Sequence, residues 1–272
     1  MIPTVLILAH GYDTGAISVA GWLARKLRPE AVRVICPEAL SLALWSHRVD
    51  ARGKASTRLV LPHAGSFATS QLAAVFNRIQ YLPLPRFNRA TPKDRDYASA
   101  ELQAVMVSWL AELGDRAVHN VRRHPWLSPS LPLLHWARAT AACGLPVAAH
   151  VVANSPRVGA SPGNPPLTSV TDGQFANSRV ARDRRNGLDN GVLMGTVLVA
   201  GEEAGGQLAD RWGSNCIEAA KSLDFPLLEF RFALEDREMV LVAVDPLPTL
   251  IDPWATALAG RLLCTLAREA SQ

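Results

Sequence analysis

The chain has 272 residues, of which 49% are hydrophobic and 19% charged, so it can bury the core of one large domain or two small ones. No apolar run approaches the roughly 18 residues that a bilayer-spanning helix needs. The first apolar segment also lacks the basic residues that precede the apolar part of a signal peptide. The cysteines stand far apart and form no C-x-x-C pair, so we expect reduced thiols and a cytoplasmic protein.

The net charge of +4 comes mostly from arginine, because lysine is rare in this chain. The arginines are dispersed, apart from Arg122-Arg123 and the stretch 179–185, and no basic stripe is interleaved with aromatic residues. A nucleic-acid-binding surface usually gathers its charge on one face. We therefore expect no nucleic-acid partner and no membrane partner.

The chain opens with a strand, a loop and a helix. Residues 4–9 form a continuous apolar run, which is typical of a parallel strand covered on both faces. The loop 10–15 carries two glycines but matches neither G-x-G-x-x-G nor a Walker A loop, so a tight turn is the simpler interpretation. Apolar residues then recur at helical spacing over residues 16–28.

The next part of the sequence alternates strands with helices, which predicts a Rossmann-like parallel sheet. The clearest helix covers residues 94–113 and stops at Gly114. The other predicted elements are strands at 32–36, 57–61, 74–79, 117–121 and 146–152, and helices at 38–49 and 131–142.

The composition changes after residue 152. The segment 154–190 is rich in Gly, Pro, Ser, Asn and Arg, so it reads as a long irregular stretch. Order resumes with strands at 192–200, 227–234 and 239–244 and with helices at 217–223 and 254–269. We predict an α/β protein with a Rossmann-like domain over 1–150 and an α+β domain over 151–272.

Several polar residues follow predicted strands, at the edge of a doubly wound sheet where ligands usually bind. Asp13 follows the first strand, where it suits either a ligand contact or a helix N-cap. Arg122 and Arg123 end a later strand, and they suit either carboxylate binding or a structural salt bridge. Together with Arg78 and Asn120, these residues are the candidate ligand-binding set of this domain.

The segment Leu227–Leu250 reads LLEFRFALEDREMVLVAVDPLPTL and resembles the closing hairpin of ATP-grasp enzymes such as the RimK-like glutamate ligases. The run Phe76-Asn77-Arg78 and the segment 118–123 look like parts of the pre-ATP-grasp domain of peptide- or amino-acid-modifying members. The resemblance implies that 1–150 is a Rossmann-like pre-ATP-grasp domain and that 151–272 is a reduced ATP-grasp-like domain.

The resemblance also implies a magnesium site on the closing hairpin, where the family's last strand ends in a Glu-x-Asn-x-x-Pro pattern. Here Ala243 stands in place of the Glu, and Asp245 stands in place of the Asn and keeps an oxygen ligand. On the first strand of the hairpin, Glu229 and Arg231 are nearest to the family's metal-binding Asp. Glu229 and Asp245 are therefore the candidate metal ligands, whereas an arginine at this place would repel the cation.

The nucleotide side departs further from the family, which holds ATP phosphates with lysines. No lysine occurs between Cys143 and Lys221. Arginines of the irregular segment, Arg182 and Arg185 among them, could contact phosphates instead, or could simply form a solvated basic loop.

Three functional hypotheses follow. The first is a degenerate ATP-grasp-like protein that has lost catalysis and acts as a binding or partner subunit, with a protein partner or as a homodimer, in cofactor or peptide modification. The second is an atypical carboxylate-amine ligase that uses ATP and Mg²⁺ on a peptide or small-molecule substrate. The third is a small-metabolite binder that uses the sheet edge around Asp13, Arg78 and Arg123.

Overall fold

A computed structural model describes residues 4–62, 65–118, 131–148, 192–235 and 237–270 of the chain. The chain divides into two compact units, one made of Met1–Pro129 with Thr249–Gln272 and the other of Ser130–Pro248. These units do not coincide with the predicted domains, 1–150 and 151–272, because the C-terminal helix packs within the first unit.

The first unit is built on a four-stranded sheet with the order β2-β1-β6-β7, and all three strand pairs are parallel. The strands are β1 (Thr4–Leu8), β2 (Val32–Ile35), β6 (Leu72–Asn77) and β7 (Ala117–Val118). Residues 5–8 of β1 are fully buried, as the continuous apolar run predicted for a strand covered on both faces.

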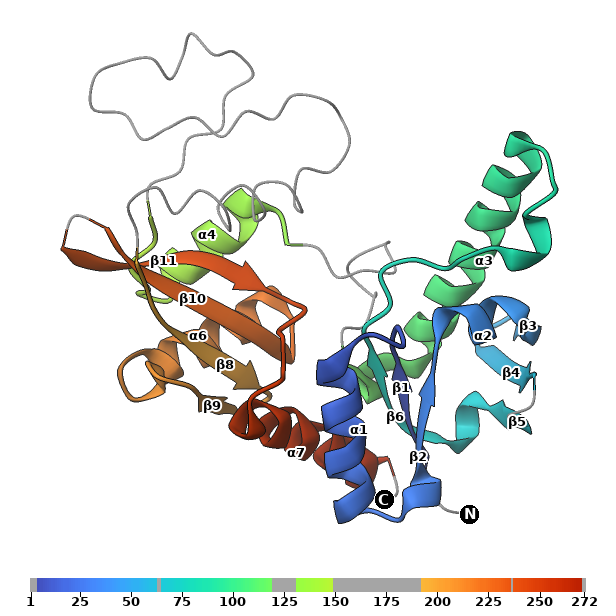
Figure 1. Cartoon of the computed structure of the whole chain (residues 1–272), viewed down its shortest axis with the longest axis horizontal. Coiled ribbons are helices and arrows are strands. Elements are labelled where there is room, and N and C mark those ends of the chain that lie inside the picture. The colour runs from blue at the N-terminus through green and yellow to red at the C-terminus, as the bar shows by residue number, and fades with distance from the viewer. Residues whose placement is uncertain (1–3, 63–64, 119–130, 149–191, 236, 271–272) are drawn as a thin grey trace, which may run out of the picture. The chain divides into compact units, whose positions relative to one another are not determined.

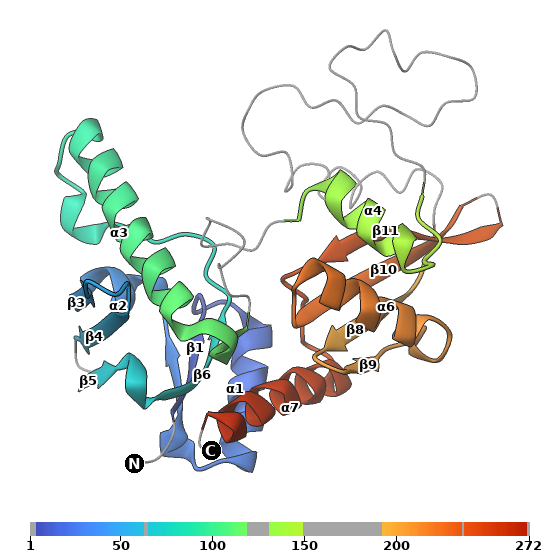
Figure 2. The ribbon, with the colours of Figure 1, turned by 180° about the vertical axis from the view of Figure 1, so that it is seen from behind.

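Helices cover both faces of this sheet (Figures 1 and 2). Helix α3 (Pro92–Leu113) adds Met106, Trp109 and Leu110 to a core that also contains Leu6 and Leu8 of β1. Helices α1 (Thr14–Lys26) and α7 (Pro253–Glu269) pack against each other, and α7 also contacts β6. Sequence elements from both ends of the chain therefore build this unit.

The segment after β2 differs from the predicted helix 38–49. A short helix, α2 (Pro37–Leu42), is followed by β3 (Leu44–Val49), which pairs antiparallel with β4 (Ala55–Leu61). Strand β5 (Gly65–Ala68), absent from the prediction, completes a three-stranded sheet in the order β3-β4-β5. The indole of Trp45 donates to the carbonyl of Leu40 at 2.9 Å, so local bonding joins the helix end to the strand.

The second unit contains a four-stranded antiparallel sheet with the order β11-β10-β8-β9 (Figure 1). Its strands are β8 (Val192–Ala200), β9 (Glu203–Gly205), β10 (Leu227–Glu235) and β11 (Glu238–Asp245). Its helices are α4 (Leu133–Ala142) and α6 (Ala209–Leu223), and α6 begins eight residues before the predicted start at 217. The mixed α/β architecture confirms the predicted fold class.

Alternation along β10 separates a buried face from a polar one. Leu228, Phe230 and Phe232 are fully buried and pack with Cys216 and Ala219 of α6. The residues between them, Glu229 and Arg231, are only partly buried and lie on the opposite face of the sheet. The hairpin therefore holds its polar side chains on a rigid strand whose other face is fixed in the core.

Candidate functional site

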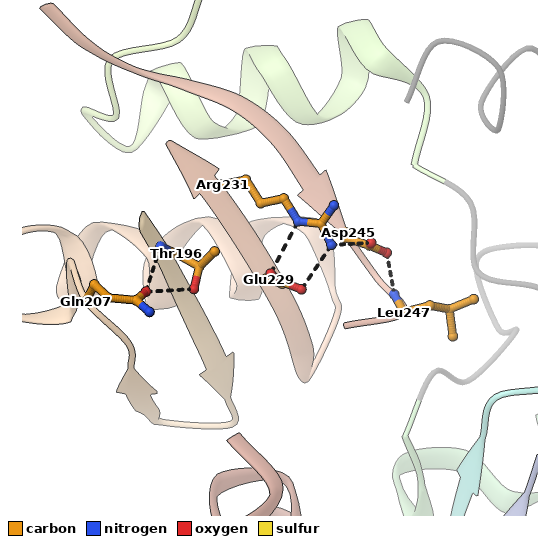
Figure 3. Close-up of polar contacts among 6 residues, drawn as sticks. All are labelled: Thr196, Gln207, Glu229, Arg231, Asp245 and Leu247. Atoms are coloured by element: carbon orange, nitrogen blue, oxygen red, sulfur yellow. Dashed lines mark hydrogen bonds and ion pairs between the residues drawn. The ribbon is translucent and has the colours of Figure 1, made fainter. Parts of the chain in front are cut away.

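The hairpin β10–β11 brings three charged side chains together. Glu229 and Arg231 lie two residues apart on one face of β10, and the strand register places Asp245 opposite Glu229. Ala243 is the register partner of Arg231, so it offers only a methyl group beside the guanidinium. Figure 3 shows the Arg231 guanidinium between the two carboxylates.

The guanidinium of Arg231 engages both acids. Its Nε donates to Glu229 Oε1 at 3.2 Å, and its Nη2 donates to Glu229 Oε2 at 3.2 Å and to Asp245 Oδ2 at 2.9 Å. The remaining oxygen, Asp245 Oδ1, accepts the backbone N–H of Leu247 at 2.8 Å. All four carboxylate oxygens are therefore hydrogen-bonded inside the protein (Figure 3).

Arg231 is held in its charged form. Burial by itself lowers the pKa of a guanidinium, but the hydrogen bonds and negative charges of Glu229 and Asp245 outweigh it and raise the pKa of Arg231 above its ordinary value. The three side chains are only 15–20% exposed, so solvent screens these charges weakly. Glu229, Arg231 and Asp245 therefore form a compact internal cluster of one cation and two anions, which we call the triad.

These residues do not fit the Mg²⁺ ion that the sequence resemblance implies. Mg²⁺ binds oxygen ligands in near-octahedral geometry, but here a fixed cation already occupies the space between the two predicted ligands. Over the part of the chain that the structure describes, no three His, Cys, Asp or Glu side chains gather into a metal-binding group. Glu229 and Asp245 are register partners, and the guanidinium of Arg231 pairs with both of them.

The other predicted site residues fall into two groups. Asn120, Arg122, Arg123, Arg182 and Arg185 lie outside the described residues. The predictions that they bind a ligand or phosphates therefore stay predictions.

Asp13 and Arg78, by contrast, meet at the carboxyl edge of the parallel sheet in the first unit. Arg78 Nε donates to Asp13 Oδ2 at 2.6 Å, and Asp13 Oδ1 accepts the N–H of Ala16 at 2.9 Å. Asp13 therefore serves as the N-cap of α1, which was one of the two roles predicted for it. The same carboxylate also pairs with a second predicted ligand-binding residue.

The sequence did not predict the aromatic cluster around His10, whose carbonyl accepts the backbone N–H of Asp13. The His10 ring contacts the rings of Tyr12 and Tyr81, with centroid distances of 5.1 Å and 4.6 Å. Tyr12 and His10 are close in the sequence, but Tyr81 follows the strand end by four residues. Only the parallel pairing of β1 and β6 brings it near, so no local pattern could have identified it.

The described part of the chain contains no helix that is both long and apolar enough to cross a membrane. Its four cysteines are free thiols.

No protein-family model and no curated protein matches the sequence. Solved structures do match it. The macrocyclase MdnB from Microcystis aeruginosa MRC has a TM-score of 0.69 at 17% identity, covering 96% of this chain and 99% of that one. The macrocyclase MdnC from the same organism, bound with the precursor peptide MdnA, has a TM-score of 0.65 at 12% identity, with coverage of 96% and 99%.

A third similar structure is the ATP-grasp ligase PsnB complexed with a minimal precursor, Mg and ADP. Its TM-score is 0.64 at 14% identity, and the match covers 98% of both chains. At such low identities the likeness concerns the fold. Because it extends over nearly the whole chain, it confirms the fold that the closing hairpin and the strand-end motifs predicted. The chain has the fold of the ATP-grasp ligases.

Proposed function

We propose that this protein is a non-catalytic relative of the ATP-grasp ligases that serves peptide modification in the cytoplasm as a peptide-binding or partner subunit. The observation that carries the proposal is the guanidinium of Arg231 between Glu229 and Asp245. The peptide part rests on the structural neighbours, since MdnC and PsnB were solved with their precursor peptides.

Electrostatics argue against a metal beside this arginine. Two unit charges 4 Å apart interact by about 4 kcal/mol at an effective dielectric of 20, so a divalent cation near the guanidinium would meet about 8 kcal/mol of repulsion. At the same distance each of the two carboxylates would attract the ion by about 8 kcal/mol, so the guanidinium cancels about half of their attraction. The ion could bind only if Arg231 first left both carboxylates, which costs the ion pairs that hold it.

The test is a calorimetric titration of the purified protein with ATP and Mg²⁺, together with an ADP-release assay in the presence of acidic peptides. We expect no Mg²⁺-dependent ATP binding and no ADP release, while PsnB with its precursor serves as the positive control. Micromolar binding of Mg-ATP with peptide-stimulated ADP release would overturn the proposal.

The alternative is an atypical ATP-dependent carboxylate-amine ligase. It is favoured by the neighbour PsnB, which was solved with Mg and ADP as well as a precursor. Under this alternative Glu229 and Asp245 would hold the metal and arginines would hold the phosphates. Asp245→Ala should then abolish activity without unfolding the protein. Asp245→Asn is the milder variant, because its amide oxygen can still accept the N–H of Leu247. Unchanged activity in both variants would exclude this role for Asp245.

A further inference from the structure

A second cluster of polar side chains lies in the first unit, where β1 and β6 end side by side. Leu8 and Asn77 are register partners at the carboxyl ends of these strands, and the N–H of Arg78 donates to the carbonyl of Leu8 at 2.8 Å. His10 follows β1 directly after Ala9. Parallel α/β sheets bind their ligands at this edge, because the strand ends and the following loops meet there.

Two side-chain nitrogen atoms of this cluster are buried without a partner. His10 is 6% exposed and Arg78 is 7% exposed. Arg78 uses its Nε for Asp13, but its Nη1 and the Nε2 of His10 have no hydrogen-bond partner among the residues that the structure describes. Native proteins rarely leave buried polar atoms unpaired, and the exceptions often mark functional sites.

Aromatic rings pack against both groups: Tyr12 and Tyr81 against His10, and Phe76 against the guanidinium of Arg78. The His10 ring stacks on Tyr12 with an interplanar angle of 12° and is tilted by 33° against Tyr81. Tyr12 and Tyr81 are themselves 74% and 53% exposed, so neither ring is held in the apolar core. A hydrogen bond with Tyr81 raises the pKa of Tyr12, and its phenol therefore stays neutral at physiological pH.

We propose that this edge binds a carboxylate group, which accepts hydrogen bonds from Arg78 Nη1 and His10 Nε2 when Tyr12 moves aside. A planar carboxylate matches the guanidinium fork, and its two oxygens suit two separate donors. Asp13 already neutralises one charge of the cluster, so a singly charged anion suits it better than a doubly charged phosphate. A free carboxylic acid and the acidic side chain of a peptide present the same group.

This site is built from residues of the first unit and the triad from residues of the second, and its ligand binding does not depend on whether the protein uses ATP. Three probes distinguish the possible sources of the carboxylate. Butyrate represents a free acid with one carboxylate, and N-acetyl-glutamate N-methylamide represents a peptide side chain. N-acetyl-glutamine N-methylamide has the same shape without the charge and serves as the negative control.

Binding is measured by calorimetric titration and by chemical-shift changes in NMR spectra. His10→Phe keeps an aromatic ring against the two tyrosines but removes Nε2. Arg78→Lys keeps the positive charge but removes the planar guanidinium. We expect each variant to weaken binding of the preferred carboxylate by about tenfold or more. The matched controls are His135→Phe and Arg48→Lys, two exposed positions on other elements, and they should bind like the wild type.

Stronger binding of butyrate would identify a free acid as the ligand, and stronger binding of the glutamate derivative would identify a peptide. The proposal is overturned if neither carboxylate binds, if the glutamine derivative binds equally well, or if His10→Phe leaves the affinity unchanged. His10→Phe decides the matter even if Arg78→Lys fails to fold, because it leaves the ion pair between Asp13 and Arg78 intact.

Discussion

Replacing Arg231 with methionine tests whether an internal cation has taken the place of a metal ion. The variant removes the guanidinium but keeps a side chain of comparable length, so the two carboxylates are left facing each other across the hairpin. Removing one partner of a fully buried ion pair costs about 3–5 kcal/mol, and an exposed pair is worth about 0–1 kcal/mol. Because the three side chains are 15–20% exposed, we expect a loss of about 2 kcal/mol in the free energy of unfolding.

The same change should create a site for a divalent cation. If the freed carboxylates bind Mg²⁺ with a dissociation constant of about 1 mM, 10 mM Mg²⁺ stabilises the variant by about 1.4 kcal/mol. In the wild-type protein the ion must first displace Arg231 at a cost of about 2 kcal/mol, which weakens binding roughly 30-fold. The same concentration then stabilises the wild type by only about 0.2 kcal/mol.

The assay is urea unfolding of the wild type and of Arg231→Met, each with and without 10 mM Mg²⁺ at constant ionic strength. The matched control is a triple variant with Glu229→Gln, Arg231→Met and Asp245→Asn. It keeps side chains of similar shape but lacks the carboxylates, so Mg²⁺ should not change its free energy of unfolding. The reasoning is refuted if Mg²⁺ stabilises the wild type as much as Arg231→Met. It also fails if the triple variant responds as strongly as the single one.

Three further predictions concern packing, burial and capping. A Cβ at Gly260 of α7 would lie 2.3 Å from the ring of Trp22, so Gly260→Ala should destabilise the protein by about 1–3 kcal/mol in urea unfolding. By contrast, Gly21→Ala in α1 meets only a flexible side chain at 3.8 Å and should stabilise by up to about 1 kcal/mol; equal effects would contradict the packing. Burial raises the pKa of Cys216 to about 12, so above about pH 9 only the unfolded thiol loses its proton. Wild-type stability should therefore fall relative to Cys216→Ala by about 1.4 kcal/mol per pH unit up to about pH 12, and parallel pH profiles would refute this. Asp13→Asn removes an ion pair but keeps a good N-cap, so Asp13→Ala should cost about 1 kcal/mol more in thermal unfolding; equal losses would mean that the cap contributes nothing.

The regular elements of the fold could be predicted where the local pattern was unambiguous. The apolar run at 4–9 and the helical spacing of 94–113 and 254–269 agree with β1, α3 and α7 to within a few residues. The predicted helix 38–49 was half wrong, because Leu44–Val49 pairs with β4 and this pairing outweighs its local preference. Short strands such as β5 have too few residues to show the alternation of apolar and polar side chains that predicts a strand.

The sequence by itself determined the unusual chemistry of the closing hairpin: an alanine in place of a glutamate, an aspartate in place of an asparagine, and an arginine close to them. It also determined that Asp13 and Arg78 follow strands. Only the tertiary structure decided that these residues meet. The register of the hairpin joins Arg231 and Asp245, which are 14 residues apart in the chain. The parallel pairing of β1 and β6 joins Asp13 and Arg78, which are 65 residues apart. The sequence contains the charged groups, but the tertiary structure determines which of them form ion pairs. It also determines that Arg78 Nη1 and His10 Nε2 have no partner among the described residues.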